Sequence, residues 1–443
     1  MSLTPDSQTA PISAAATARG LPTRRRWFML VLLLIATVIN YVDRVNISII
    51  APFMAKDLGL DKIHMGMIFS AFAWTYAIAL IPAGFIADRF GSRMTYGVSL
   101  ITWSIATVFQ GLATGFASLF GLRLVVGAAE TPAFPSNMRA VTAWFPARER
   151  GFASSVYVCG QYLGTALFTG LLLWMATTFG WRHVFYATGA VGIVFGIVWM
   201  MAYRDPMSCK KVSKEELNYI EEGGGLIKAG KQLTPFNWRQ VFTLLRYRQV
   251  WSICIGKFAN TSVLYFFLTW FPTYLMEERK MSTVKVGIFA VMPFIGATVG
   301  ILLAGFISDL LIRRGTSLSF ARKLPLVVGS ALGMSIVLVN FTDSNVLCIA
   351  ILTCAFFAQG IASASWAAVS EVAPRQLLGL TGSVTSLAAN IGGIVTPLVI
   401  GAIVQSTHNF AYAFWFIGCL ALMGTLSYSF LLGRLHRIEL KTP

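Results

Sequence analysis

Four charged side chains of two opposite signs stand inside apolar stretches of this 443-residue chain. Asp43 and Arg44 are neighbours in one stretch, and Arg123 and Glu130 lie seven residues apart in another. Seven residues are two helical turns, about 10.5 Å, so Arg123 and Glu130 share one helix face. A charge at the centre of a bilayer costs roughly 2.5–3.5 kcal/mol on insertion scales, so such residues need partners or water and commonly mark a functional site.

The chemistry of this set follows from competition for the arginines. Arginine binds a carboxylate through two parallel hydrogen bonds. When a substrate anion takes an arginine, a neighbouring acid loses its counter-charge and is protonated more readily, so proton and anion favour each other's binding. We predict that Asp43 and Glu130 carry protons, that Arg44 holds a substrate carboxylate and that Arg123 tunes an acid. The spacing leaves open which acid pairs with which arginine. The competing interpretation is a pair of buried salt bridges that only fix helix packing.

The elements that position these residues are predicted from the apolar stretches. The chain is 56% hydrophobic and only 12% charged, which argues against a soluble enzyme. A membrane-spanning helix needs about 20 apolar residues. Twelve segments qualify: 27–51, 63–87, 94–114, 117–138, 151–177, 183–203, 249–275, 286–308, 324–341, 346–370, 377–405 and 410–433.

These segments predict an all-α polytopic membrane protein of twelve transmembrane helices in two six-helix bundles, 27–203 and 249–433. A polar middle loop, 204–248, separates the bundles, and two tails, 1–26 and 434–443, flank them, the first predicted to be disordered. The side with the tails and the middle loop carries 26 Lys and Arg against 11 Asp and Glu, and the opposite loops carry 6 against 5. Positive charge predicts the cytoplasmic side, so the net charge of +17 reports topology rather than a nucleic-acid partner.

A short charged motif occurs once in each predicted bundle. Gly84, Asp88 and Arg93 follow the second segment, and the same three residue types recur 221 positions later at Gly305, Asp309 and Arg314. The motif also contains Arg89 and Gly91 in the first copy and Arg313 in the second. Two six-helix halves in parallel repeat fit this spacing. We expect the glycines to allow close helix approach, and the charged groups to pair at the cytoplasmic helix ends.

The repeated loop resembles the signature loop of the major facilitator superfamily. Further motifs at 41–46, 69–76, 123–135, 144–150, 219–226, 268–275 and 320–323 resemble the anion:cation symporters, and within them the bacterial galactonate and glucarate transporters. The resemblance runs from about residue 25 to 440. It implies proton-coupled uptake of a sugar-acid anion, a hexonate or an aldarate, across the bacterial inner membrane by alternating access.

The resemblance also implies which polar side chains bind the sugar. It assigns substrate contacts to Tyr41, Tyr76, Gln161, Ser363, Ser365 and Trp366. Two positions depart from the family. Ser386 stands where the sugar-acid transporters usually carry Asn, and Asn390, one turn further on, is a substitute on the same helix face. Lys257 stands where Gln is expected, either reaching the cytoplasmic surface along its aliphatic stem or giving the substrate a second cationic contact.

Two other function classes remain as alternatives. One is a proton-coupled transporter of another organic anion, such as an aromatic or tartrate-like acid. The other is a non-transporting membrane sensor of such an acid. No combination of nucleophile, base and orienting group is recognisable, so we expect no enzyme activity. We also expect no metal site, no cofactor besides the coupling proton, and a monomer, because each half supplies the partner of the other.

Overall fold

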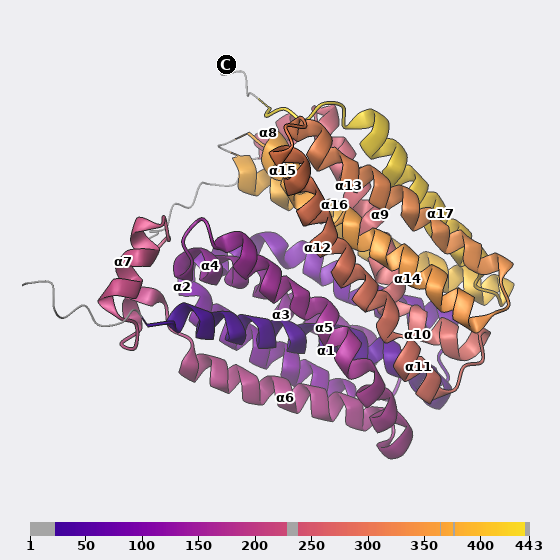
Figure 1. Cartoon of the computed structure of the whole chain (residues 1–443). Coiled ribbons are helices and arrows are strands. Elements are labelled where there is room, and N and C mark those ends of the chain that lie inside the picture. The colour runs from indigo at the N-terminus through magenta and orange to yellow at the C-terminus, as the bar shows by residue number, and fades with distance from the viewer. Residues whose placement is uncertain (1–22, 228–237, 364, 375–376, 439–443) are drawn as a thin grey trace, which may run out of the picture.

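Two bundles of helices converge at one end of the molecule and diverge at the other (Figure 1). The computed structural model describes residues 23–227, 238–363, 365–374 and 377–438, except for the side chains at 81, 88, 238, 309, 366, 367, 378 and 379. We call the end where the described chain begins and stops, with α7 and α8, the terminal end, and the end with α10 and α11 the far end (Figure 1).

Six long helices form the first half. They are α1 (Arg25–Leu58), α2 (Lys62–Gln110), α3 (Phe116–Glu130), α4 (Ala133–Trp144), α5 (Arg150–Phe179) and α6 (Trp181–Ala202). α2 covers two predicted spans. Between them, at Gly91, the backbone leaves the helical conformation, with φ 75° and ψ 163°, which glycine adopts without strain. α3 and α4 together form one predicted span, which is interrupted at Thr131 and Pro132 because proline lacks the N–H of a helix interior.

The middle segment contains helices where the sequence predicts only a polar loop. They are η1 (Pro206–Ser208), α7 (Lys214–Glu222) and α8 (Trp238–Leu244). The buried Glu216 of α7 accepts hydrogen bonds from the backbone N–H groups of Arg25, at 2.9 Å, and Arg26, at 3.1 Å, and from the Thr23 hydroxyl. A carboxylate stabilises a helix N-terminus. α1 therefore begins at Arg25, two residues before the predicted span.

The second half has more interruptions than the first. Its elements are α9 (Arg248–Thr269), α10 (Phe271–Thr273), η2 (Tyr274–Glu278), α11 (Thr283–Phe289), α12 (Val291–Arg313), α13 (Leu318–Gly333), η3 (Met334–Phe341), α14 (Asn345–Ala362), α15 (Ser365–Val372), α16 (Leu378–Thr407), α17 (Ala411–Leu426) and η5 (Ser427–Leu431). Each of the six predicted spans of this half corresponds to one helix or to two or three successive elements in this series.

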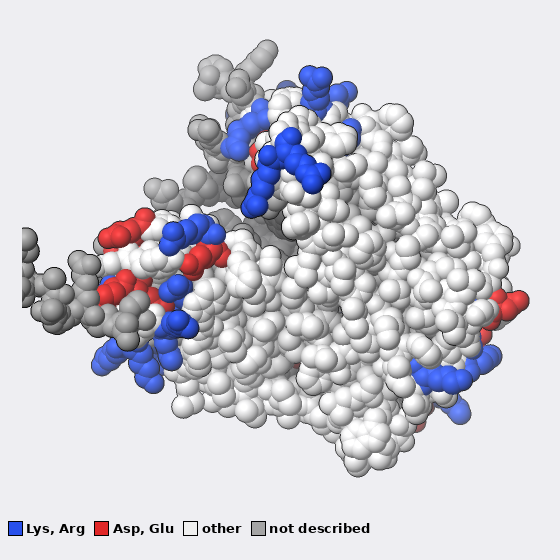
Figure 2. All heavy atoms as spheres, viewed as in Figure 1, with Lys and Arg blue, Asp and Glu red and all other residues white. Residues whose placement is uncertain are grey.

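The surface has the character of a membrane protein. In the part of the chain that the structure describes, ten helices are long and apolar enough to cross a bilayer. Lys, Arg, Asp and Glu gather at the terminal end and in a smaller group at the far end, and the surface between them shows none in this view (Figure 2). Large apolar side chains are exposed on the helices, among them Ile78 at 78% and Phe430 at 77%. Helices that are apolar on their outer faces as well are typical of a lipid environment.

The buried core joins the halves only in part. One large cluster contains residues of both halves, and within it Phe69 packs on Trp270 and Tyr162 packs on Phe356. A second cluster, around Trp103 and Trp199, belongs to the first half, and a third, around Tyr428, belongs to the second half. The shared cluster includes α10 and α11 residues and lies toward the far end, which explains why the bundles converge there.

Candidate functional site

Arg44 and Glu130 form an ion pair inside the first half. Arg44 lies midway along α1, and Glu130 is the last residue of α3, just before the break at Pro132. Close packing of α3 on α2 holds this geometry, because a Cβ on Gly127 would stand 2.2 Å from the backbone oxygen of Phe72. The Glu130 side chain is fully buried, and the Arg44 side chain is 14% exposed.

Three aromatic rings surround the Arg44 guanidinium. Its Cζ atom lies 4.8 Å from the ring centre of Tyr41, 4.6 Å from that of Phe72 and 5.0 Å from that of Tyr76. Cation–π attraction at such distances is worth about 0.5–2 kcal/mol, the upper value in desolvated sites. The second half also reaches this group, because the buried Tyr265 of α9 interacts electrostatically with Arg44. The site therefore lies where the two bundles meet.

Asp43 faces away from this ion pair. It is fully buried, and its Oδ2 atom accepts a hydrogen bond of 3.1 Å from the indole N–H of Trp103 on α2. Successive residues of a helix point about 100° apart, so the neighbours Asp43 and Arg44 contact different helices. The structure thus divides the predicted four-charge set into one ion pair, one acid bonded to tryptophan and one further arginine.

That further arginine is Arg123 of α3. Its side chain is 3% exposed, and its Nε and Nη1 atoms have no hydrogen-bond partner among the described residues. The guanidinium lies 5.3 Å from the ring centre of Phe72 and interacts electrostatically with Glu130. Unused N–H groups on a buried cation are suited to binding an anion. The expectation that Arg44 holds the substrate and that Arg123 tunes an acid stays a prediction, and these N–H groups make Arg123 a second candidate for the substrate carboxylate.

The other predicted contact residues fall into two groups. Tyr41 and Tyr76 are at the ion pair, and Gln161 is partly exposed on α5. The residues of the second half form the other group. The Ser363 hydroxyl donates to the oxygen of Gly360 at 2.6 Å, and Ser365 is buried at the start of α15. The Trp366 side chain lies outside the described part.

The two positions that depart from the family have defined surroundings. The Asn390 amide donates to the backbone oxygen of Ser386 at 2.9 Å, so Asn390 bonds within its own helix. Lys257 is 6% exposed, and its Nζ atom donates to the Thr385 hydroxyl on α16 at 3.3 Å. Lys257 therefore points between α9 and α16, a burial that favours the second interpretation, a cationic contact for the substrate, over extension to the cytoplasmic surface.

The repeated loops stand at the terminal end. Arg93 donates two hydrogen bonds, of 2.9 and 2.7 Å, to the oxygen of Met200 on α6, and Arg89 lies 5.4 Å from the ring of Phe90. Arg313 ends α12, and Arg314 follows as its C-cap residue. The Asp88 and Asp309 side chains lie outside the described part. A Cβ on Gly84 or Gly305 would meet no described atom within 4 Å, so neither glycine lies at a close helix contact in this conformation.

Sequence reasoning missed three residues of the site. Phe72 lies in the 69–76 motif but carries no polar group, and it contacts both arginines. Trp103 and Tyr265 stand in apolar helices, where an aromatic residue usually packs in the core or at the membrane interface. No sequence signal distinguishes them, because their role depends on which helix each one faces.

Comparison with known proteins decides the family. The family model described as Major Facilitator Superfamily matches residues 33–366. The chain belongs to the major facilitator superfamily. It is a multi-pass membrane transporter rather than an enzyme, and its fold is the all-α major facilitator fold of twelve transmembrane helices in two six-helix bundles. The predicted resemblance is confirmed.

Full-length relatives narrow the family. The chain is 43% identical to the D-galactonate transporter of Escherichia coli O6:H1 over 97% of this chain and 99% of that one. It is 42% identical to a protein of Escherichia coli K12 described as a probable galactarate/D-glucarate transporter, over 97% and 98% of the two chains. A solved bacterial homologue of the human lysosomal transporter Spinster has the same fold, with a TM-score of 0.69 and 20% identity over 92% of this chain and 94% of that one.

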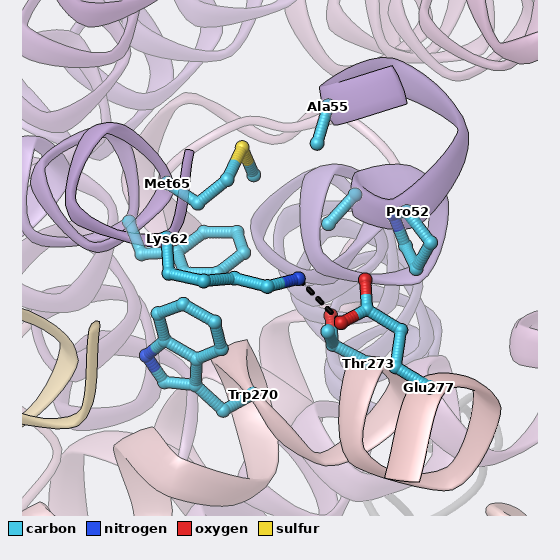
Figure 3. A pocket seen from close by; sticks show the side chains of 9 residues that line it. Pro52, Ala55, Lys62, Met65, Trp270, Thr273 and Glu277 are labelled. Carbon is cyan, nitrogen blue, oxygen red and sulfur yellow. Dashed lines mark hydrogen bonds and ion pairs between the residues drawn. The ribbon is translucent and has the colours of Figure 1, made fainter. Parts of the chain in front are cut away.

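The far end of this major facilitator protein is closed by contacts between the halves. Lys62 of α2 forms an ion pair with Glu277 of η2 beside a shallow recess (Figure 3). The Lys62 backbone N–H donates to the Gln405 side chain of α16 at 3.0 Å, and the Phe69 ring packs on Trp270. The halves therefore meet at the far end through both backbone and side-chain groups.

Gly66 makes the tightest approach in this closure, and its replacement is expected to open the far end. A Cβ on Gly66 would stand 2.7 Å from the oxygen of Pro397. Overpacking costs about 1–3 kcal/mol, so Gly66→Val is expected to shift the conformational equilibrium about 5- to 150-fold away from this state. Spin labels at the exposed positions 114 and 343 report the change as a longer electron–electron distance. Gly121→Val is the matched control, since its Cβ meets nothing within 4 Å, and an unchanged distance in Gly66→Val would contradict the prediction.

Proposed function

We propose that the chain is a proton-coupled symporter that imports a sugar-acid anion, a hexonate or an aldarate such as galactonate or glucarate. The observation that carries the proposal is the pairing of Arg44 with Glu130 beside Arg123, whose N–H groups have no described partner. The two full-length relatives named for galactonate and for galactarate and glucarate support this substrate class. Protons are the coupling ions, and no cofactor takes part.

The site residues act through competition for positive charge. The substrate carboxylate binds Arg123 first, because that guanidinium has N–H groups free to donate. The anion also attracts Arg44 and weakens its hold on Glu130, which then takes up a proton. The Tyr41 and Tyr76 hydroxyls, together with Gln161, bind the sugar hydroxyls by hydrogen bonds. Asp43 is the second proton carrier. Proton and anion thus enter the same occluded state together.

The conformation fits one step of alternating access. In this proposal the protein lies in the bacterial inner membrane with the terminal end and both termini in the cytoplasm, and the excess of Lys and Arg on that side supports this orientation. A state closed at the far end then exposes the site toward the cytoplasm, where substrate is released. Gly84 and Gly305 lack close neighbours in this state, and we expect helices to close on them when the terminal end shuts. The monomer contains both halves of the site and is the working unit.

A ligand screen tests the substrate class. The melting temperature of the purified protein is measured with D-galactonate, D-glucarate, tartrate and benzoate at equal concentration. A ligand at 100 times its Kd stabilises the folded state by about 2.7 kcal/mol. We expect a rise with a hexonate or an aldarate and none with benzoate. A higher melting temperature with benzoate or tartrate alone would indicate that the substrate is another organic anion and not a sugar acid.

A further inference from the structure

One cation lies deep inside the second half. Lys257 of α9 is 6% exposed, and among the described residues of that half it is the only charged side chain buried to this degree. A lysine at the centre of a bilayer costs roughly 2.5–3.5 kcal/mol on insertion scales, and charged residues inside membrane spans commonly mark a substrate or ion pathway. The burial of Lys257 therefore calls for a role that repays this cost.

The ammonium group of Lys257 points toward two elements of the second half. Its Nζ atom donates to the Thr385 hydroxyl of α16, and that hydroxyl donates its own proton to the oxygen of Gly382 at 3.1 Å. Cys254, one turn before Lys257, interacts with it electrostatically and packs in the third cluster with residues of α15. Lys257 thus lies where α9 meets α15 and α16. These two elements carry four of the predicted substrate contacts, Ser365, Trp366, Ser386 and Asn390.

The same helix leads from Lys257 to the arginines of the first half. Tyr265 of α9 interacts electrostatically with both Arg44 and Arg123. Lys257 lies eight residues before Tyr265, which is about 12 Å along the helix axis. α16 stays close to α9 over this distance, because a Cβ on Gly393 would stand 2.5 Å from Cζ of the Tyr265 ring. The ammonium and the two guanidinium groups therefore stand at different depths along one pair of packed helices.

The separation matches the length of a six-carbon dicarboxylate. Five carbon–carbon bonds of about 1.5 Å place the two carboxylate carbons of an extended aldarate about 6 Å apart. An ion pair adds up to about 4 Å between nitrogen and oxygen at each end. An aldarate that binds Arg123 with one carboxylate is therefore long enough to reach Lys257 with the other.

The charges at the site favour a dianion. The two acids and two arginines of the first half sum to zero when both acids are ionised. Once Glu130 has taken up a proton in the proposed symport, this set carries +1, and Lys257 raises the total to +2. A hexonate neutralises one of these charges, whereas an aldarate neutralises both. Because a charge left without balance in a membrane interior is costly, the dianion is the better fit.

We propose that Lys257 binds the second carboxylate of a six-carbon aldarate, so that the protein prefers dicarboxylates to the corresponding hexonates. This inference rests on the proposed transport of sugar acids and names the substrate class of that site. An ammonium group has three N–H donors, so Lys257 keeps its hydrogen bond to Thr385 while it donates to the carboxylate. A hexonate presents a neutral hydroxyl group at the same place and gains only the weaker, uncharged hydrogen bond.

Two ligands that differ at one carbon test this preference. Galactarate has a carboxylate at carbon 6, where galactonate has a hydroxyl group. Isothermal titration calorimetry of the purified protein measures Kd for each. We expect the wild type to bind galactarate about thirtyfold more tightly than galactonate, the scale of a buried charge pair. Lys257→Gln is expected to weaken galactarate binding by about the same factor and to leave galactonate nearly unchanged. Lys257→Arg keeps the charge and is expected to retain a preference for galactarate.

The matched control is Lys323→Gln. Lys323 is a partly buried lysine of the same half, and its Nζ atom donates to the backbone oxygen of Ser429 at 2.7 Å. Its ammonium group is therefore held between α13 and η5, and not between α9 and α16. We expect its replacement to leave the ratio of the two Kd values at the wild-type level.

Three results would overturn the inference. Equal Kd values for galactarate and galactonate in the wild type would do so without any variant, which keeps the test valid if Lys257→Gln does not fold. A Lys257→Gln protein that still prefers galactarate would exclude the contact. An equal loss of affinity for both acids in this variant would assign Lys257 a role in helix packing alone. Failure of the proposed function is distinct, because the wild type would then bind neither sugar acid, and both proposals would fall together.

Discussion

Arg123→Gln is expected to weaken the binding of the sugar acid about a hundredfold, because removing one partner of a buried charge pair costs about 3 kcal/mol. In the free protein, the Arg123 Nε and Nη1 atoms have no described partner, so this guanidinium is ready to receive a carboxylate. Isothermal titration calorimetry of the purified protein with galactonate or glucarate measures the change in Kd.

The matched control for this prediction is Arg182→Gln at the far end. Arg182 is half-buried and pairs with Asp57, away from the site. Its replacement is expected to leave Kd unchanged. Arg44→Gln distinguishes the roles of the two arginines. It removes the counter-charge of Glu130, and we expect substrate binding in this variant to lose its dependence on pH. An Arg123→Gln protein with the wild-type Kd would remove Arg123 from the substrate site.

Asp43→Asn and Glu130→Gln are expected to retain counterflow and to lose accumulation driven by a pH gradient, by a factor of about 100 or more. Each replacement imitates the protonated acid and keeps the size of the side chain, so the substrate still binds and exchanges. The net movement of protons stops, because the replaced group neither takes up nor releases one. Proteoliposomes loaded with unlabelled substrate, or energised by a pH gradient, report the two activities separately.

The control for the acids is Asp57→Asn, which removes an acid at the far end that contacts Arg182 and Trp181. It is expected to leave both activities close to wild type. Gradient-driven accumulation that survives in both Asp43→Asn and Glu130→Gln would exclude these acids as proton carriers. Survival in one variant alone would assign the coupled proton to the other acid.

The charged residues of the site could be predicted from sequence, but their pairing could not. A charge within an apolar helix stands out because of its insertion cost, and this signal identified Asp43, Arg44, Arg123 and Glu130. Pairing depends on the direction of each side chain. Asp43 and Arg44 are adjacent in sequence, yet one faces Trp103 and the other faces Glu130. The rotation of α1 within its bundle decides this, and hydropathy does not report that rotation.

The fold could be predicted from the apolar stretches and the 221-residue repeat, but the interruptions within its helices could not. The sequence predicts one span over 117–138, where the structure has α3, a break at Pro132 and α4. Glu216 is an equally clear case. In sequence it is one of several acids in a polar segment, and only the folded chain brings it to the N-terminus of α1. Such long-range contacts leave no local pattern.

The conformational state also lies beyond the sequence. Gly84 and Gly305 were expected at close helix contacts, yet the structure leaves space around both. A transporter that alternates between two states needs a sequence compatible with both. A small residue therefore predicts a close helix contact but not the state in which that contact forms. Gly66 shows the opposite case, since the far-end closure of this state packs directly on it.

The most direct test of proton-coupled sugar-acid import is transport by the purified wild-type protein in proteoliposomes. Labelled galactonate and glucarate are supplied outside, with the lumen more alkaline than the medium. We expect at least one of them to accumulate above the external concentration, and this accumulation to be lost when a protonophore collapses the gradient. Equilibration of every sugar acid without accumulation, or accumulation that survives the protonophore, would contradict proton coupling.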